Sequence, residues 1–173
     1  ADHTLVKFPV KVDEFGLPDY DSLMANYAKI TELGKGKVIE AAYAVGFGGI
    51  AEAVSKMAFG NRIGAEVCGN MPKEDLFKAE YGAIIAEVSK DNMGKLEASG
   101  VEYSVIGQTI AEEAFVCGDV KITMEEALKA WTGTLEKVFP TRATEDVSVV
   151  ETGLYDAKNI YVCKNKVAKP TVF

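Results

Sequence analysis

A mostly apolar run followed by clustered glycines constrains the fold of this chain more than any other feature. Residues 37–45 read KVIEAAYAV, a composition that predicts a strand covered on both faces. GFGG follows at 46–49, and small and apolar residues at helical spacing continue to GNRIG at 60–64. A strand, a glycine loop and a helix in this order predict an α/β unit whose helix presents its N-terminus at the loop.

Strand and helix patterns alternate along the rest of the chain. They predict strands at 4–10, 63–68, 82–89, 101–110 and 111–117 and helices at 18–34 and 91–100. Thr123 and Glu126 form a capping box for a further helix that Pro140 ends. Its inward face is predicted to carry Met124, Leu128, Trp131, Leu135 and Val138. The alternation predicts an α/β sandwich of helices around a mixed sheet.

Composition excludes several functional classes. The chain has 173 residues, a length typical of one domain, and its net charge of −7 argues against a general nucleic-acid surface. The longest apolar run falls far short of the ~20 residues that a membrane helix needs. Three cysteines without C-x-x-C spacing and the single His3 argue against a zinc site and predict reduced thiols in a cytoplasmic protein. No metal site is predicted.

The glycine loop suggests local anion binding. Glycines allow close approach of a ligand to the backbone, and the helix dipole favours negative charge at that end. No G-K-[ST] follows the loop, and the dinucleotide pattern fails at Ala51, so close packing of the helix against the strand explains the glycines equally well. Only two of the 19 cationic residues are arginine, whose planar fork suits phosphate, although a surface salt bridge is the alternative for each. The candidate phosphate or nucleotide contacts are therefore Gly46, Phe47, Gly48, Gly49, Arg62 and Arg142.

Four separated motifs together resemble one family. They are GKVIEAAYAVGFGGIAEAVSKMAFGNRIG, LFKAEYGAIIAEV, GVEYSVIGQT and LEKVFPTR, in that order. The chain resembles phosphoribosylformylglycinamidine synthase from about Asp2 to Phe173, and within it the second C-terminal-type module of the aminoimidazole ribonucleotide synthetase (PurM-like) superfamily. The resemblance implies a three-layer α/β/α fold with partly ferredoxin-like topology. Residues 1–163 are expected to form this module, and KNKVAKPTVF at 164–173 resembles a linker toward a glutaminase domain.

The resemblance also implies an activity. Members of this family ligate formylglycinamide ribonucleotide with glutamine-derived ammonia in de novo purine biosynthesis, using ATP and magnesium. The implied partners are a small-molecule substrate, N-terminal synthetase modules and a glutaminase domain of the same parent chain. A module of this kind is expected to be inactive alone and to expose an apolar patch, which predicts self-association.

The glycine loop departs from the family pattern. Members carry His-Asp-x-Ser-Asp-Gly-Gly-Leu where this chain has YAVGFGGI at 43–50, so both glycines remain but the histidine, the acids and the serine are lost. A loop without carboxylates cannot bind magnesium or exchange protons. Tyr43 and Phe47 either line a pocket or belong to the core. Glu80 lies where relatives often carry an acid, and a solvated loop acid is the alternative. No catalytic residue is assigned.

Three functions remain open from the sequence. The first is a domain of the purine amidotransferase that contributes anion contacts and architecture. The second is a catalytically silent scaffold that packs neighbouring domains or holds a structural nucleotide. The third, a related kinase-like enzyme such as selenophosphate synthetase, is disfavoured because those enzymes carry their magnesium-binding acids on an N-terminal module.

Overall fold

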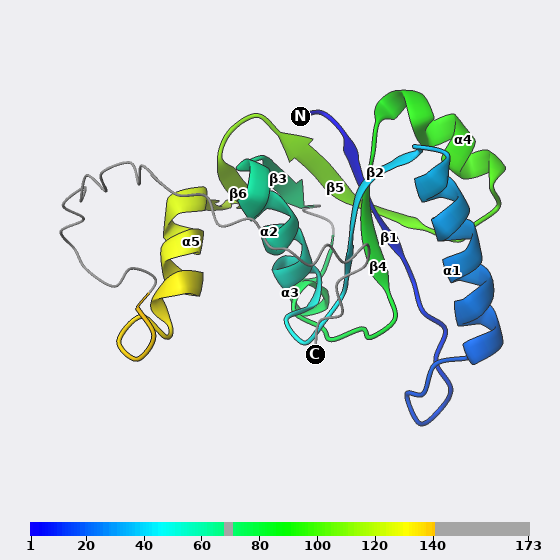
Figure 1. Ribbon diagram of the computed structural model, residues 1–173, viewed down its shortest axis with the longest axis horizontal. Coiled ribbons are helices and arrows are strands. Elements are labelled where there is room, and N and C mark those ends of the chain that lie inside the picture. The colour runs from blue at the N-terminus through cyan, green and yellow to red at the C-terminus, as the bar shows by residue number, and fades with distance from the viewer. Residues whose placement is uncertain (68–70, 141–173) are drawn as a thin grey trace, which may run out of the picture. The chain divides into compact units, whose positions relative to one another are not determined.

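The computed structural model describes residues 1–67 and 71–140, and the predicted linker at 164–173 and Arg142 lie outside these ranges. The chain divides into two compact units, Ala1–Phe139 and Pro140–Phe173, and every element named here belongs to the first. Within the described residues, seven strands form one mixed sheet in the order β2-β4-β1-β5-β3-β6-β7 (Figure 1). The strands are β1 (Thr4–Phe8), β2 (Ile39–Ala44), β3 (Gly64–Val67), β4 (Ile84–Val88), β5 (Ser104–Ile110), β6 (Ala114–Cys117) and β7 (Val120–Thr123).

The helices connect these strands. They are α1 (Tyr20–Lys35), α2 (Gly49–Asn61), α3 (Lys73–Leu76), the short 3₁₀ turn η1 (Lys90–Asn92) with α4 (Met93–Ala98), and α5 (Met124–Gly133). Asp19 caps α1 by accepting a hydrogen bond from the Ser22 N–H, and α1 continues to Lys35, one residue past the predicted stop at Gly34. The sequence patterns did not predict α3 and β7, which are only four residues long.

Two split β-α-β units account for four of the seven strands of the described sheet. β4 lies antiparallel between β1 and β2, which α1 connects, and β1 lies antiparallel between β4 and β5, which α4 connects. The resulting order β2-β4-β1-β5, with a helix in each crossover, is the ferredoxin-like arrangement. The segment α2-β3-α3 is inserted between β2 and β4, and β3 extends the sheet beyond β5. The expected mixed sheet with partly ferredoxin-like topology is therefore confirmed.

Two apolar clusters show that helices cover both faces of the sheet. One cluster joins Ile50, Ala53 and Val54 of α2 to Leu5 and Ile85 of the sheet. The other joins α1 and α4, through Leu33 and Leu96, to Val6, Phe8 and Ala86. Because neighbouring residues such as Leu5 and Val6 belong to different clusters, the side chains alternate between the faces. The architecture is a three-layer α/β/α sandwich.

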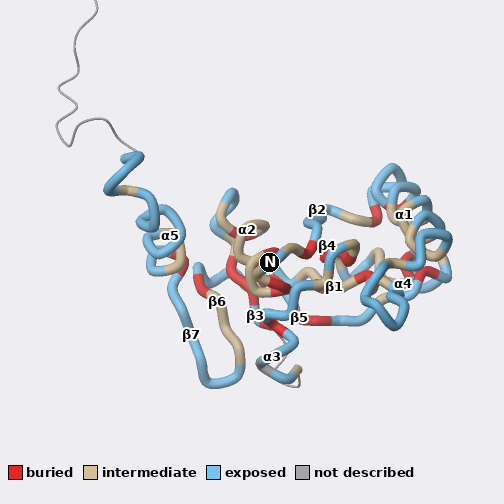
Figure 2. The backbone as a smooth tube through the Cα atoms, turned by 90° about the horizontal axis from the view of Figure 1, so that it is seen from below, coloured by how far each residue is buried: buried red, intermediate tan, exposed pale blue. Residues whose placement is uncertain are grey.

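Two burial predictions are wrong. β2 was expected to be covered on both faces, but it is an edge strand whose residues from Glu40 to Ala44 are exposed (Figure 2). The helix that begins after Thr123 was expected to continue to Pro140, but α5 ends at Gly133. Its predicted inward face is also largely exposed: within α5 Met124 is buried but Trp131 is more than half exposed, and Leu135 and Val138, which lie beyond the helix, are exposed to the same degree. Small apolar residues in β2 and helical spacing in α5 indicate structure, but neither reveals which neighbours are present to cover them.

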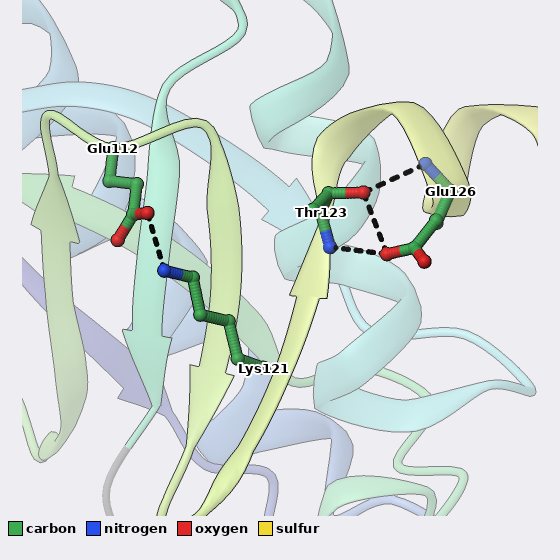
Figure 3. A network of polar contacts seen from close by, with 4 residues as sticks. All are labelled: Glu112, Lys121, Thr123 and Glu126. Atoms are coloured by element: carbon green, nitrogen blue, oxygen red, sulfur yellow. Dashed lines mark hydrogen bonds and ion pairs between the residues drawn. The ribbon is translucent and has the colours of Figure 1, made fainter.

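The β6–β7 hairpin and the start of α5 follow local rules. The Thr123 side chain accepts from the Glu126 N–H at 3.2 Å, and the Glu126 carboxylate accepts from the Thr123 N–H at 3.0 Å (Figure 3). This capping box confirms the sequence prediction. Lys121 pairs with Glu112 across the hairpin in the same view.

Candidate functional site

The glycine loop lies where β2 passes into α2. The Val45 N–H donates to the Ala83 carbonyl at 2.9 Å, and the Gly49 N–H donates to the Gly46 carbonyl at 3.2 Å, which closes the loop. Gly48 is the N-cap of α2. The strand, loop and helix therefore occur as the sequence predicts.

Gly49 is required by packing. Its φ of +69° lies in the left-handed region, and a Cβ there would lie 2.6 Å from the Leu76 carbonyl oxygen and 2.7 Å from the Phe77 carbonyl carbon. Both of these atoms belong to backbone, so they cannot move aside as a side chain can. At this position the glycine permits close packing of α2 against α3, which was the alternative to a ligand role.

The chain places its own carboxylate at the helix N-terminus. Glu52 accepts the Gly48 N–H through Oε2 at 2.7 Å and the Lys56 ammonium through Oε1 at 2.5 Å. The hydrogen bond from Lys56, followed by that from the Gly48 N–H, holds the pKa of Glu52 below its ordinary value of 4.5. Glu52 and Lys56 thus form a pair at i and i+4, and the carboxylate also occupies a backbone donor of the loop.

The two candidate arginines are not brought together at the loop. Arg62 is the C-cap of α2, so the 13-residue helix separates it from Gly48 by about 20 Å. Its Nε donates to Glu113 at 2.8 Å, and this partner raises the pKa of the guanidinium. The expectation that Arg62 reaches the glycine loop is therefore wrong, and the salt-bridge alternative describes it. Arg142 lies outside the described residues.

Exposed aromatic residues gather at the end of the sheet that carries the loop. β1 and β2 both end opposite Ile84, where β4 begins, so the connections that follow β1 and β2 and precede β4 meet at that end (Figure 1). Phe47 is 83% exposed, and Phe77 and Tyr81 are also exposed. The core interpretation of Phe47 is wrong, and Tyr43 is likewise exposed at its position on β2.

A cavity of about 510 Å³ adjoins the loop. Gly48 and Glu52 lie at one part of its wall, and most of the remaining wall is apolar. Its volume falls within the range of ~300–1,000 Å³ that is usual for small-molecule sites. Its other lining residues include Ser55 of α2, Phe77, Phe115 and Cys117 of β6, and Ile122 of β7.

Two half-buried polar contacts join side chains that are far apart in the sequence. Glu80 accepts from Lys7 at 2.8 Å, and each side chain is 20% exposed, so the interpretation of Glu80 as a freely solvated acid is wrong. His3 lies 2.7 Å from Glu87. The partners are 73 and 84 residues apart, and no local pattern connects residues at such separations.

The described residues do not assemble a magnesium site. Among them, no group of three or more His, Cys, Asp and Glu side chains could hold a metal ion. Glu52 is the nearest acid to the loop, and both of its oxygens already accept hydrogen bonds. Across the same residues, no helix is long and apolar enough to cross a membrane.

The fold of this chain occurs in solved structures of other proteins. The solved structure of PurLQS from Thermotoga maritima matches 72% of this chain with a TM-score of 0.60 at 15% identity, over 25% of its own length. Hydrogenase maturation protein HypE matches 71% of the chain with a TM-score of 0.50 at 12% identity, over 52% of its length. The chain therefore has the fold of a module that occurs in PurL and HypE.

A comparison with curated sequences finds a relative among PurL proteins. Phosphoribosylformylglycinamidine synthase subunit PurL of Helicobacter hepaticus is 28% identical over 109 residues, which span 58% of this chain and 14% of that protein. No family model matches the sequence. The resemblance drawn from the four motifs is confirmed: the chain is related to a segment of PurL and spans about one seventh of that relative's length.

Proposed function

We propose that this chain acts as a module of a phosphoribosylformylglycinamidine synthase, the ATP-dependent ligase that converts formylglycinamide ribonucleotide to the amidine in purine biosynthesis. The observation that carries the proposal is the 28% identity to PurL over 109 residues on a fold that PurL shares. Solved structures of Thermotoga maritima PurL with ATP and with FGAR share that fold. This relationship favours a module of the amidotransferase over a catalytically silent scaffold that packs neighbouring domains or holds a structural nucleotide.

Within such an enzyme the chain's role is to position ligands. The YAVGFGGI segment supplies no acid, and the first acid after it, Glu52, is held by Gly48 and Lys56. Magnesium does not fit these donors, so metal binding and proton transfer belong to other modules of the synthase. The enzyme would act in the cytoplasm, and the glutaminase that supplies ammonia would be a further partner.

The nucleotide or phosphate contacts in this proposal are backbone groups of Gly46, Phe47, Gly48 and Gly49. Three features support them: the strand–loop–helix geometry, the exposure of Phe47 and the adjoining cavity. A phosphate at Gly48 would have to displace the Glu52 carboxylate, since both need the same N–H. Arg142 remains a proposed additional contact, whereas Arg62 is too distant to contribute.

A module exchange tests the function directly. In Helicobacter hepaticus PurL, the segment that matches this chain is replaced by the corresponding residues of the chain. The chimera is then expressed in a bacterial purine auxotroph that lacks PurL. Growth without purines is expected, together with ADP release that depends on formylglycinamide ribonucleotide and ammonia.

The matched control is the equivalent HypE module in the same position, because it shares the fold at 12% sequence identity. Growth with this chain but not with the HypE module would assign the function to features beyond the fold. A soluble, folded chimera that releases no ADP, or equal growth with both modules, would contradict the proposal.

A further inference from the structure

The strand β2 offers an unguarded sheet edge. Among the described strands it pairs with β4 alone, and its residues from Glu40 to Ala44 are exposed. Free edges normally carry lysine, proline or inward-pointing charge, which prevent pairing with other chains. β2 instead reads IEAAYA: its one charged residue is Glu40, and three alanines and Tyr43 follow.

The direction of its backbone groups can be worked out from one hydrogen bond. The Val45 N–H points at β4, since it donates to the Ala83 carbonyl. In an antiparallel pair, the N–H and C=O groups of alternate residues point to the same side. The backbone N–H and C=O groups of Tyr43 therefore point toward β4, as those of Val45 do. The N–H and C=O groups of Ala42 and Ala44 point outward, away from β4. The register irregularity between Ile39 and Ala41 lies outside this regular stretch.

We propose that this edge binds the β2 strand of a second copy of the chain, antiparallel and centred on Tyr43. In that register Ala42 of each copy lies opposite Ala44 of the other, so all four outward groups of each copy are paired. The two Tyr43 residues face each other at the non-hydrogen-bonded position, where aromatic side chains interact favourably.

The self-complementary backbone pairing and the absence of opposed like charges favour a second copy as the occupant. Each Glu40 lies opposite Gly46 of the other copy, so the two carboxylates are about 20 Å apart along the strands (six residues at ~3.4 Å each). Lys56 of each copy is already neutralised by Glu52. No like charges oppose each other within Ala41–Ala44. The side chains of Ala42 and Ala44 are exposed methyl groups that α1 does not cover.

The test measures the oligomeric state of the full 173-residue chain by sedimentation over a wide concentration range. Wild-type protein is expected to show a concentration-dependent dimer. Tyr43→Glu places two carboxylates across the axis, and Ala42→Pro removes an outward donor that an edge strand can lose. Each is expected to raise the dimer dissociation constant about tenfold or more.

The matched control is Lys121→Pro on β7, the edge strand at the opposite side of the sheet. The Met124 N–H donates to the Glu113 carbonyl and so points toward β6, and the backbone N–H of Lys121, three residues earlier, therefore points outward. This control is expected to leave the dimer unchanged.

A cysteine pair fixes the register. Facing residues at a non-hydrogen-bonded position have Cα atoms about 4.5 Å apart, which suits a disulfide, so Tyr43→Cys is expected to cross-link under mild oxidation. Ala42→Cys is expected not to cross-link beyond the level of wild type, because its nearest counterpart is displaced along the strand. A monomer at every concentration would overturn the proposal, as would Tyr43→Glu dimerising like wild type while retaining its circular dichroism. Cross-linking through Ala42→Cys in place of Tyr43→Cys would overturn the register.

Discussion

Each end of α2 has a residue in the left-handed backbone conformation, but the type of residue and the charged group beside it differ. At the N-terminal end a glycine takes the left-handed backbone, Gly49 at φ +69°, and a charged side chain from within the helix, Glu52, binds the Gly48 N–H. At the C-terminal end a large residue, Arg62, takes the left-handed backbone at φ +54° and pairs with Glu113 from outside the helix.

The difference lies in what surrounds each end. Backbone of α3 lies against Gly49, so no Cβ fits there, whereas nothing comparable prevents a side chain at position 62. The glycine is thus fixed by packing and the arginine by a solvent-exposed pair. Both ends are satisfied by charges of the chain itself, and any anion that binds the loop must compete with one of them.

The largest effect is expected from Gly49→Ala. Its Cβ would meet backbone atoms at 2.6 and 2.7 Å in a conformation that L-residues rarely adopt. Strain and overpacking together should lower the free energy of unfolding by about 2–4 kcal/mol, measured by urea denaturation. The control is Gly60→Ala in the same helix, where no atom lies within 4 Å of the new Cβ. It should raise stability by about 0.5–1 kcal/mol. Equal effects of the two substitutions would show that α3 does not constrain Gly49.

A smaller loss is expected from Glu52→Gln, about 1 kcal/mol, the usual worth of an N-terminal cap. The pKa of Glu52 is lowered in the folded state, so its contribution is complete above the unfolded value near 4.5 and is lost as pH falls through the folded pKa. The difference between wild type and Glu52→Gln should therefore disappear in acid. Glu97→Gln, which removes an exposed carboxylate of α4, should be neutral at every pH. A pH-independent difference for Glu52→Gln would contradict the assignment.

A second substitution of Glu52 distinguishes the two interpretations of the glycine loop, anion binding and close packing. Glu52→Ala frees the Gly48 N–H, so inorganic phosphate should shift the amide resonances of Gly48 and Gly49 in this variant more strongly than in wild type. If these amides stay unmoved in Glu52→Ala while the variant remains folded, the loop serves packing alone.

The sequence predicted the elements with strong local signals. The capping box of Thr123 with Glu126 and the glycine loop before α2 are both present, because their interactions join residues within one turn or loop. The four ordered motifs identified the relationship to PurL, which in turn supplied the sheet topology. The short β7 lacked a pattern long enough to be distinguished from its surroundings.

The site was predicted less well because it depends on contacts between distant segments. Lys7 with Glu80 and Arg62 with Glu113 join residues 73 and 51 positions apart, and the sequence gives no sign of either pair. The exposure of β2 also depends on distant segments, because a strand rich in small apolar residues has the same sequence pattern whether its edge is covered or free. The distance of Arg62 from Gly48, by contrast, follows from the sequence, because a helical count places Arg62 at the far end of the helix.

The smallest effects are expected at Arg62, and their signs are informative. Arg62→Ala removes the exposed pair with Glu113 but keeps a Cβ in the left-handed conformation, so it should lower the urea midpoint slightly. Arg62→Gly removes the same pair and relieves the backbone, so its midpoint should exceed that of Arg62→Ala. Because salt screens exposed charges, 1 M sodium chloride should abolish the difference between wild type and Arg62→Ala while preserving the difference between the two variants. If Arg62→Gly is no more stable than Arg62→Ala, the left-handed backbone carries no cost here. The contrast between the two ends of α2 would then rest on the contact of Gly49 with α3 alone.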